Sequence, residues 1–255
     1  MDEKRFNRIF SAAVLVGMVV TIAVITAFKL ASPGARVGML VVAAMASLMG
    51  VMSTVLSANG IIWTFIFGVL DAVFCCIVAY DSGATGNLAL HALYFLPMQF
   101  VGMWQWRRRG ASGEKKVKAR RMSWRGRTGV AAAIVAGTAV AYLILLKVDM
   151  MKLDAGKIDS VDRWKVFFDS AVLVLNIAGQ ILMSLAYYEQ WVVWNLVNVF
   201  SILLWGSIML SSERTGYTAV MFAKYCFYLL NSINGLRIWY GLSRPEAEPG
   251  SAPSV

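Results

Sequence analysis

Long apolar stretches, each about the length of a bilayer-spanning helix, follow one another along most of this 255-residue chain. A helix needs about 20 predominantly apolar residues to cross the hydrocarbon core of a membrane. Only 15% of the residues are charged, against about 25% in a typical soluble domain. Stretches of the required length lie at residues 9–29, 36–57, 61–80, 87–106, 128–147, 164–187, 190–210 and 216–240. We therefore expect an all-α integral membrane protein with about eight transmembrane helices.

The net charge of +10 comes largely from one segment between the fourth and fifth apolar stretches. Its basic residues are Arg107, Arg108, Arg109, Lys115, Lys116, Lys118, Arg120, Arg121, Arg125 and Arg127. Basic loops stay on the cytoplasmic side of a membrane, so this loop, and with it both termini, is expected in the cytoplasm. This placement explains the charge without a nucleic-acid partner, and the same residues can attract anionic lipid headgroups of the bilayer.

Two parts of the chain resemble each other. Each contains three apolar stretches and closes on a Gly-x-x-x-Trp motif, at Gly102–Trp106 and again, 133 residues later, at Gly235–Trp239. One extra stretch separates the copies, so both have the same orientation in the membrane. Parallel repeats of this kind are a transporter architecture. Chance similarity between hydrophobic helices is the alternative explanation.

The repeat suggests a division of the whole chain. The first apolar stretch is long for the core of a signal peptide, so we expect a retained helix. The tail after Arg244 has the Pro, Glu and Ser content of disordered sequence. The parts are a cytoplasmic stub with an extra helix (1–34), a first three-helix bundle (35–109), a basic loop with a linker helix and an outer loop (110–160), a second three-helix bundle (161–243) and a cytoplasmic tail (244–255).

A polar and aromatic seam runs along the stretch 190–210. Trp191, Trp194, Asn195 and Asn198 share one side of a helix, and apolar residues cover the rest. Carboxamides are not stable against lipid, so this side must face protein or a water-filled path. Tryptophans beside amides suit a small, flat, polar ligand. An interfacial tryptophan belt and amide hydrogen bonds between helices are the alternatives.

A second seam lies on the stretch 216–240, where Lys224, Tyr228, Asn231 and Asn234 fall on one face. Paired asparagines one turn apart can hold a hydroxyl or a carboxamide from two points. Asp169, Asn176, Gln180 and Tyr187 form a narrow stripe on the stretch 164–187. Both sets of residues serve equally well in a ligand site or in structural pairing.

The first half of the chain offers fewer candidates. Asp71 lies near the middle of its stretch and is unlikely to face lipid, while Gln99 shares a broad polar face with the lone histidine, His91. Pro97 is expected to kink this helix. The sequence contains no phosphate-binding glycine loop with its lysine, no metal-ligand cluster and no nucleophile–base motif. We therefore expect neither an enzyme nor a bound metal or cofactor.

Several motifs together resemble those of the PnuC nicotinamide riboside transporters. They are Trp191-x-x-Trp194-x-x-x-Asn198 after Glu189-Gln190, Leu88-x-x-x-x-x-Tyr94-x-x-Pro97 followed by Gly102-x-x-x-Trp106, and Asn231-x-x-Asn234-Gly235-x-x-x-Trp239. The resemblance covers about residues 40–243. The extra first helix and the long basic loop lie outside the core pattern of that family.

This resemblance implies two parallel three-helix bundles joined by a linker helix, as in the SWEET sugar transporters, in a bacterial cytoplasmic membrane. It implies facilitated diffusion of nicotinamide riboside by alternating access, with a cytosolic riboside kinase trapping the product to feed NAD synthesis, and it leaves room for a homo-oligomer. The motif carries substrate contacts over to Trp191, Trp194 and Asn198, and less directly to Gln99, Lys224 and Asn231. With Asn195, Tyr228 and Asn234 from the two seams, these form the predicted substrate site.

Other interpretations of the same residues remain open. A thiamine or riboflavin carrier of the same family would use the same seams. A retinal-binding protein would use Lys224 as a Schiff base, with Asp71 or Asp169 as counter-ion. An interaction protein would dock a partner on the basic loop, so that deletion of residues 110–123 would abolish its function yet leave transport largely intact.

Overall fold

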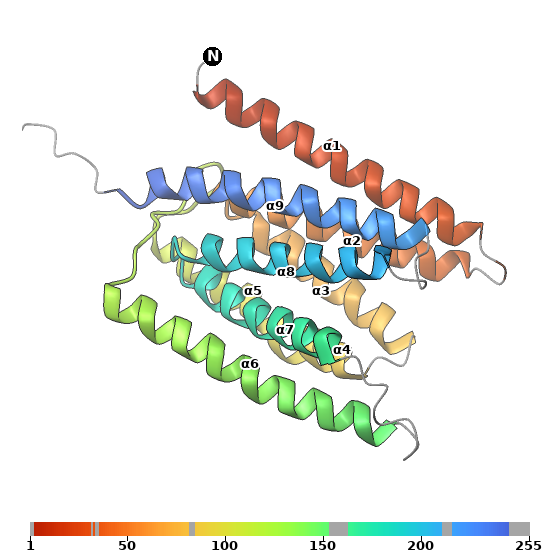
Figure 1. Cartoon of the computed structure of the whole chain (residues 1–255). Coiled ribbons are helices and arrows are strands. Elements are labelled where there is room, and N and C mark those ends of the chain that lie inside the picture. Colours follow the sequence, from red (N-terminus) through yellow and green to blue (C-terminus); the bar gives the residue numbers. More distant parts are fainter. Residues whose placement is uncertain are drawn as a thin grey trace, which may run out of the picture.

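The computed structural model describes residues 3–31, 33, 36–81, 85–152, 163–210 and 216–244. The regular elements within these ranges are helices (Figure 1). They are α1 (Glu3–Leu30), α2 (Val37–Ala58), α3 (Thr64–Asp81), α4 (Thr85–Leu90), the π-helix η1 (His91–Phe95), α5 (Leu96–Arg108), α6 (Trp124–Lys152), α7 (Arg163–Ser184), α8 (Gln190–Leu210) and α9 (Gly216–Leu242). The predicted tail after Arg244 and most of the predicted outer loop lie outside the described residues.

Among the described residues, 6 helices are long and apolar enough to cross a membrane: 5–30, 37–58, 64–81, 124–148, 163–184 and 190–210. The predicted stretches 87–106 and 216–240 are helical too. However, η1 interrupts the first of these, and α9 carries Lys224, Asn231, Asn234 and Arg237, which lower its mean hydropathy. The chain is thus an all-α membrane protein with several apolar spans.

The expected kink near Pro97 takes the form of the π-helix η1. Pro97 has no backbone N–H, so the usual hydrogen bond to the carbonyl of Leu93 cannot form. The N–H of Leu96 donates instead to the carbonyl of His91, five residues back. A wider turn absorbs the distortion, and π-helical turns of this kind frequently occur at functional sites.

The helices pack as two neighbouring groups (Figure 1). In one group α2 packs on α3 and α3 on α5, and in the other α7 packs on α8 and α8 on α9. Contacts of α2 with α9 and of α5 with α7 join the groups. Helix α6 packs against α7, and α1 lies against α2 and α9.

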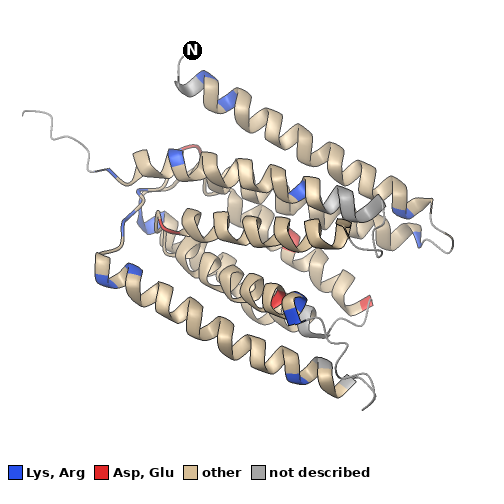
Figure 2. Ribbon diagram, in the orientation of Figure 1, with Lys and Arg blue, Asp and Glu red and all other residues tan. Residues whose placement is uncertain are grey.

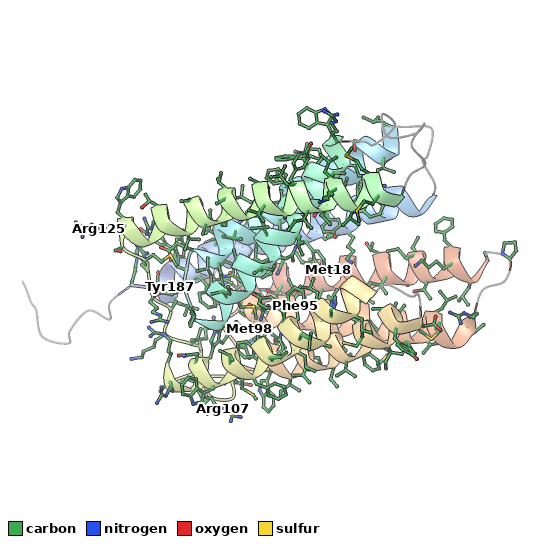
Figure 3. The ribbon with its side chains drawn as sticks, turned by 90° about the horizontal axis from the view of Figure 1, so that it is seen from below. Met18, Phe95, Met98, Arg107, Arg125 and Tyr187 are labelled. Atoms are coloured by element: carbon green, nitrogen blue, oxygen red, sulfur yellow. The ribbon has the colours of Figure 1, made fainter. Side chains whose placement is uncertain are left out.

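Both ends of the described chain and the segment 109–123 lie at the same end of the bundle, here called the basic end (Figure 1). Figure 2 shows that lysine and arginine residues gather there. In Figure 3, Arg107 and Arg125 lie at this end on opposite flanks of the bundle, with Tyr187 between them. This clustering agrees with the charge distribution seen in the sequence.

The segment 109–123, here called the strap, is an ordered element that crosses the basic end. Its backbone N–H groups donate to three separate helix ends: Val117 to the carbonyl of Gly60 at 3.0 Å, Ala119 to that of Leu242 at 3.3 Å, and Arg120 to that of Ala186 at 3.0 Å. The strap therefore connects the α2–α3 turn of one group to the α7–α8 turn and the end of α9 in the other.

Basic side chains of this region also bind the ends of helices, in addition to indicating which side of the membrane the segment occupies. The guanidinium of Arg120 donates to the carbonyl of Leu185 at 3.0 Å and lies over the ring of Tyr187. Glu189, only 8% exposed, accepts from the N–H of Met122 at 3.0 Å and from Arg127 at 2.9 Å. Arginine and glutamate thus supply partners for backbone groups that the helix ends leave unpaired.

An aromatic floor closes the bundle above the strap. Its rings are Phe65, Trp106, Trp239 and Trp191, with centroid distances of 4.9 Å, 5.3 Å and 6.2 Å between successive members. All four rings are buried in one apolar cluster with Ala111 and Val117 of the strap. The floor takes Phe65 and Trp106 from one helix group and Trp239 and Trp191 from the other, so it joins the two groups at this end.

The two Gly-x-x-x-Trp motifs make equivalent contacts in this floor. Trp106 donates its indole N–H to the carbonyl of Met183 at 2.8 Å, and Trp239 donates to that of Ser57 at 3.0 Å. Each tryptophan therefore binds the last turn of the opposite group's first helix, α7 or α2. The sequence repeat has a structural counterpart in this reciprocal pair of hydrogen bonds.

Candidate solute-binding site

A cavity of about 630 Å³ lies between the two helix groups. Residues from α2 through α5 and from α7 through α9 line it, and no described residue of α1 or α6 does. Its volume lies within the range of small-molecule sites. Met183 and Trp191 belong both to the cavity wall and to the buried cluster of the aromatic floor. The cavity therefore ends on that floor and is separated from the strap by it.

Most of the predicted substrate residues lie on the wall of this cavity. They are Gln99 from α5, Trp191, Trp194 and Asn198 from α8, and Lys224 and Tyr228 from α9. Residues far apart in the sequence thus converge on one space. Asp71, Asp169, Asn176 and Gln180 line the same space, whereas Tyr187 lies at the basic end.

Asn195, Asn231 and Asn234 do not line the cavity. Asn195 donates to the carbonyl of Trp191 at 2.6 Å and accepts from Ser232 at 3.0 Å, which ties α8 to α9. Asn231 donates to the carbonyl of Thr54 at 3.3 Å, which ties α9 to α2. Asn234 accepts from Arg237. The contacts of these three asparagines are therefore hydrogen bonds within and between helices. This is the alternative explanation that the sequence left open for the seams.

Glycines allow both tryptophans of α8 to approach neighbouring helices closely. A Cβ at Gly235 would lie 2.6 Å from the ring of Trp191, and one at Gly179 would lie 3.0 Å from the ring of Trp194. Trp191 is only 2% exposed, so the interfacial-belt interpretation does not apply to it. Trp194 is half-buried and presents part of its ring to the cavity.

Polar groups near the floor have unused hydrogen-bonding capacity. Among the described residues, the hydroxyl of Ser57, the amide oxygen of Gln99 and the indole N–H of Trp191 are buried without a hydrogen-bond partner. All three residues line the cavity. Leaving such a group unpaired costs about 1–3 kcal/mol, so this arrangement favours a guest that offers both donors and acceptors.

Helix α2 contributes a cavity wall that was not predicted from the sequence. Ser47, Gly50, Thr54 and Ser57 line the cavity and recur at helical spacing on one face of that helix. Small and hydroxyl residues are common where membrane helices pack together, so the pattern did not stand out as a ligand site. Its regular spacing was nevertheless the available signal.

Most of the chain is similar in sequence to known membrane transporters. Residues 40–241 match the family described as "Nicotinamide mononucleotide transporter". The "Nicotinamide riboside transporter PnuC" of Neisseria mucosa is 31% identical over 201 residues, which are 77% of this chain and 71% of that protein.

The chain belongs to the PnuC transporter family. The protein of the same name from Haemophilus influenzae is 29% identical over 192 residues, which are 74% of this chain and 75% of that protein. A solved structure titled "Crystal structure of the Vitamin B3 transporter PnuC" is 29% identical, with a TM-score of 0.64 and 91% of each chain covered. PnuC proteins are transporters and not enzymes, which also favours a carrier over the retinal-binding and docking interpretations.

Valine in place of Gly235 is expected to lower the melting temperature of the purified protein, because the added carbons would displace Trp191 from its position against α9. Overpacking a core position typically costs about 1–3 kcal/mol. Gly241, on the same helix, has nothing within 4 Å of the equivalent Cβ, so Gly241→Val is the matched control. Thermal unfolding followed by tryptophan fluorescence gives the melting temperature of each variant. Equal melting temperatures for the two variants would contradict this account.

Proposed function

We propose that this chain carries nicotinamide riboside across the membrane by facilitated diffusion, with the cavity as its central site. The observation that carries this proposal is the grouping of indole, carboxamide and hydroxyl groups, with unused hydrogen-bonding capacity, around one cavity between the two helix groups. The PnuC relatives, which are named as nicotinamide riboside transporters, supply the identity of the solute.

The chemistry of the cavity suits this solute. Nicotinamide riboside joins a flat, cationic pyridinium ring to a carboxamide and a ribose. A cation over an indole face gains about 0.5–2 kcal/mol, and Trp194 offers such a face. The carboxamide can donate to the oxygen of Gln99 and accept from the indole N–H of Trp191. Ser57 and Asn198 are then placed to meet ribose hydroxyls.

The finer architecture is part of the same proposal. We assign α2–α5 and α7–α9 to two parallel three-helix bundles, α6 to the linker helix and α1 to an extra N-terminal helix. The equivalent contacts of Trp106 and Trp239 support this assignment. The aromatic floor closes the cavity toward the strap. For the cavity to open alternately to each side of the membrane, the two bundles must separate at this floor.

We place the basic end, with both chain termini, in the cytoplasm of a bacterial cell, because basic segments are retained on that side of the membrane. A carrier that only equilibrates its solute gains direction when the solute is modified after entry. Phosphorylation by a cytosolic riboside kinase would add charge and trap the product, so uptake follows the activity of that partner enzyme.

The test is uptake by proteoliposomes that contain this protein together with a riboside kinase and ATP. With kinase and ATP inside, labelled nicotinamide riboside should accumulate as phosphorylated product above the external concentration, whereas in vesicles without kinase it should only reach equilibrium. Uptake equal to that of protein-free vesicles would contradict the proposal. Excess unlabelled thiamine or riboflavin tests the alternative carriers, because the true substrate should compete and the others should not.

A further inference from the structure

Asp71 places a carboxylate in the wall of the cavity, within a helix that crosses the membrane. It lies on α3, ten residues before that helix ends at Asp81. The thiol of Cys75 donates to its Oδ1 at 3.5 Å. Within the described part of the chain, no arginine, lysine or histidine nitrogen lies within ion-pair distance of this carboxylate. Carboxylates inside membrane spans are costly and usually mark a functional site.

The backbone around Asp71 holds the carboxylate toward the cavity. A Cβ at Gly50 of α2 would lie 3.2 Å from its Oδ1, so this glycine gives the carboxylate room against the neighbouring helix. The side chain of Gln99 packs against Gly68, three residues earlier on α3. Three residues of helix correspond to a rise of ~4.5 Å, so Asp71 lies about one turn of α3 from the residue that Gln99 contacts.

A second set of charges and ionisable groups faces the same space. Besides Asp71, the cavity is lined by Cys75, His91, Asp169, Lys224, Tyr225 and Tyr228. The ammonium of Lys224 lies 5.8 Å and 5.3 Å from the ring centroids of Tyr225 and Tyr228. Aromatic rings stabilise a cation there. Lys224 and His91 act on the Asp71 carboxylate at longer range, but neither forms an ion pair with it among the described residues.

We propose that Asp71 is the counter-charge for the cationic ring of the solute and makes the carrier selective for cationic over neutral nucleosides of the same shape. This inference rests on the proposed function. It adds the residue that makes binding depend on the charge of the solute. A pyridinium ring supplies an opposite charge at contact distance, closer than the basic groups that line the same cavity. A neutral ring of equal size leaves the carboxylate without such a close partner and binds more weakly.

The experiment compares nicotinamide riboside with its 1,4-dihydro form, which keeps the carboxamide and ribose but has no ring charge. Affinities of purified protein in nanodiscs for both probes give a preference ratio for each variant. We expect wild-type protein to bind the cation about tenfold more tightly than the neutral form, because one partly hydrated charge pair contributes an energy of that order. Asp71→Asn should remove most of this preference. Lys224→Gln, which removes a like charge, should raise the ratio.

The matched control is Asp81→Asn. It makes the same change on the same helix, at a carboxylate that pairs with Arg36 and does not line the cavity. A preference ratio unchanged in Asp71→Asn, or equal losses for both probes, would overturn the assignment while leaving the carrier intact. If riboside fails to bind wild-type protein, the proposed function falls as well. Should Asp71→Asn not fold, an unchanged ratio in Lys224→Gln would overturn the electrostatic account.

Discussion

Alanine in place of Trp194 is expected to reduce the initial rate of nicotinamide riboside uptake by about tenfold or more. The ring of Trp194 lines the cavity and is supported from behind by Gly179 of α7. Truncation removes the flat surface for the pyridinium ring, and the loss of one aromatic stacking partner typically costs about 1–3 kcal/mol. Asn198→Ala, which removes a carboxamide from the same wall, should also lose most of the uptake.

Trp205→Ala is the matched control for this prediction. Trp205 lies on the same helix, and the same indole is removed, but the residue does not line the cavity. Trp194→Phe should retain an intermediate rate because it keeps an aromatic face. All variants are compared at equal amounts of folded protein, judged by size-exclusion profile. Equal uptake by the Trp194 and Trp205 variants would place the solute elsewhere.

Aspartate in place of Val117 is expected to destabilise the protein severely. Val117 is 1% exposed and packs in the cluster that contains Trp106, Trp191 and Trp239. An unpaired carboxylate in that apolar environment costs several kcal/mol, which is a large part of the stability of most proteins, about 5–15 kcal/mol. We expect most of the protein to be lost from the monodisperse peak after extraction in mild detergent.

Lys115→Asp introduces the same side chain at an exposed position of the strap and should leave the profile unchanged. The comparison also decides between a structural strap and a free docking loop. Deletion of residues 110–123 should abolish the folded protein, contrary to what the interaction-protein interpretation of the sequence requires. Wild-type stability of Val117→Asp would show that the floor does not depend on the strap.

The helices were predictable from the sequence because a bilayer fixes the length of each apolar span. Residues 190–210, for example, form a helix with the predicted bounds. The strap was not predictable in the same way. Its basic residues carry a topology signal, and only Ala111 and Val117 are buried, too few for a periodic pattern. Its order comes from hydrogen bonds to helix ends that only the tertiary structure brings together.

The site was predictable in part, for a related reason. Helical periodicity shows which residues of α8 share a face, but it does not show which partner that face meets. Trp194 and Asn198 line the cavity, and Asn198 also donates to Ser232 of α9 at 3.1 Å. Asn195, between them on the same seam, bonds the same serine but does not line the cavity. The hydroxyl face of α2 has a regular helical spacing but no residue type specific to a ligand, so the packing of α2 beside the cavity was needed to assign it to the site.

The strap also constrains the order in which the molecule can be assembled during synthesis. Arg121 binds Ser243 across a separation of 122 residues, so the ribosome completes the partner long after it has made the strap. Until α9 has entered the bilayer, Val117 has no finished apolar environment. A nascent chain should therefore stay sensitive to proteases at residues 109–123 until release, and C-terminal truncation before Leu242 should prolong that sensitivity.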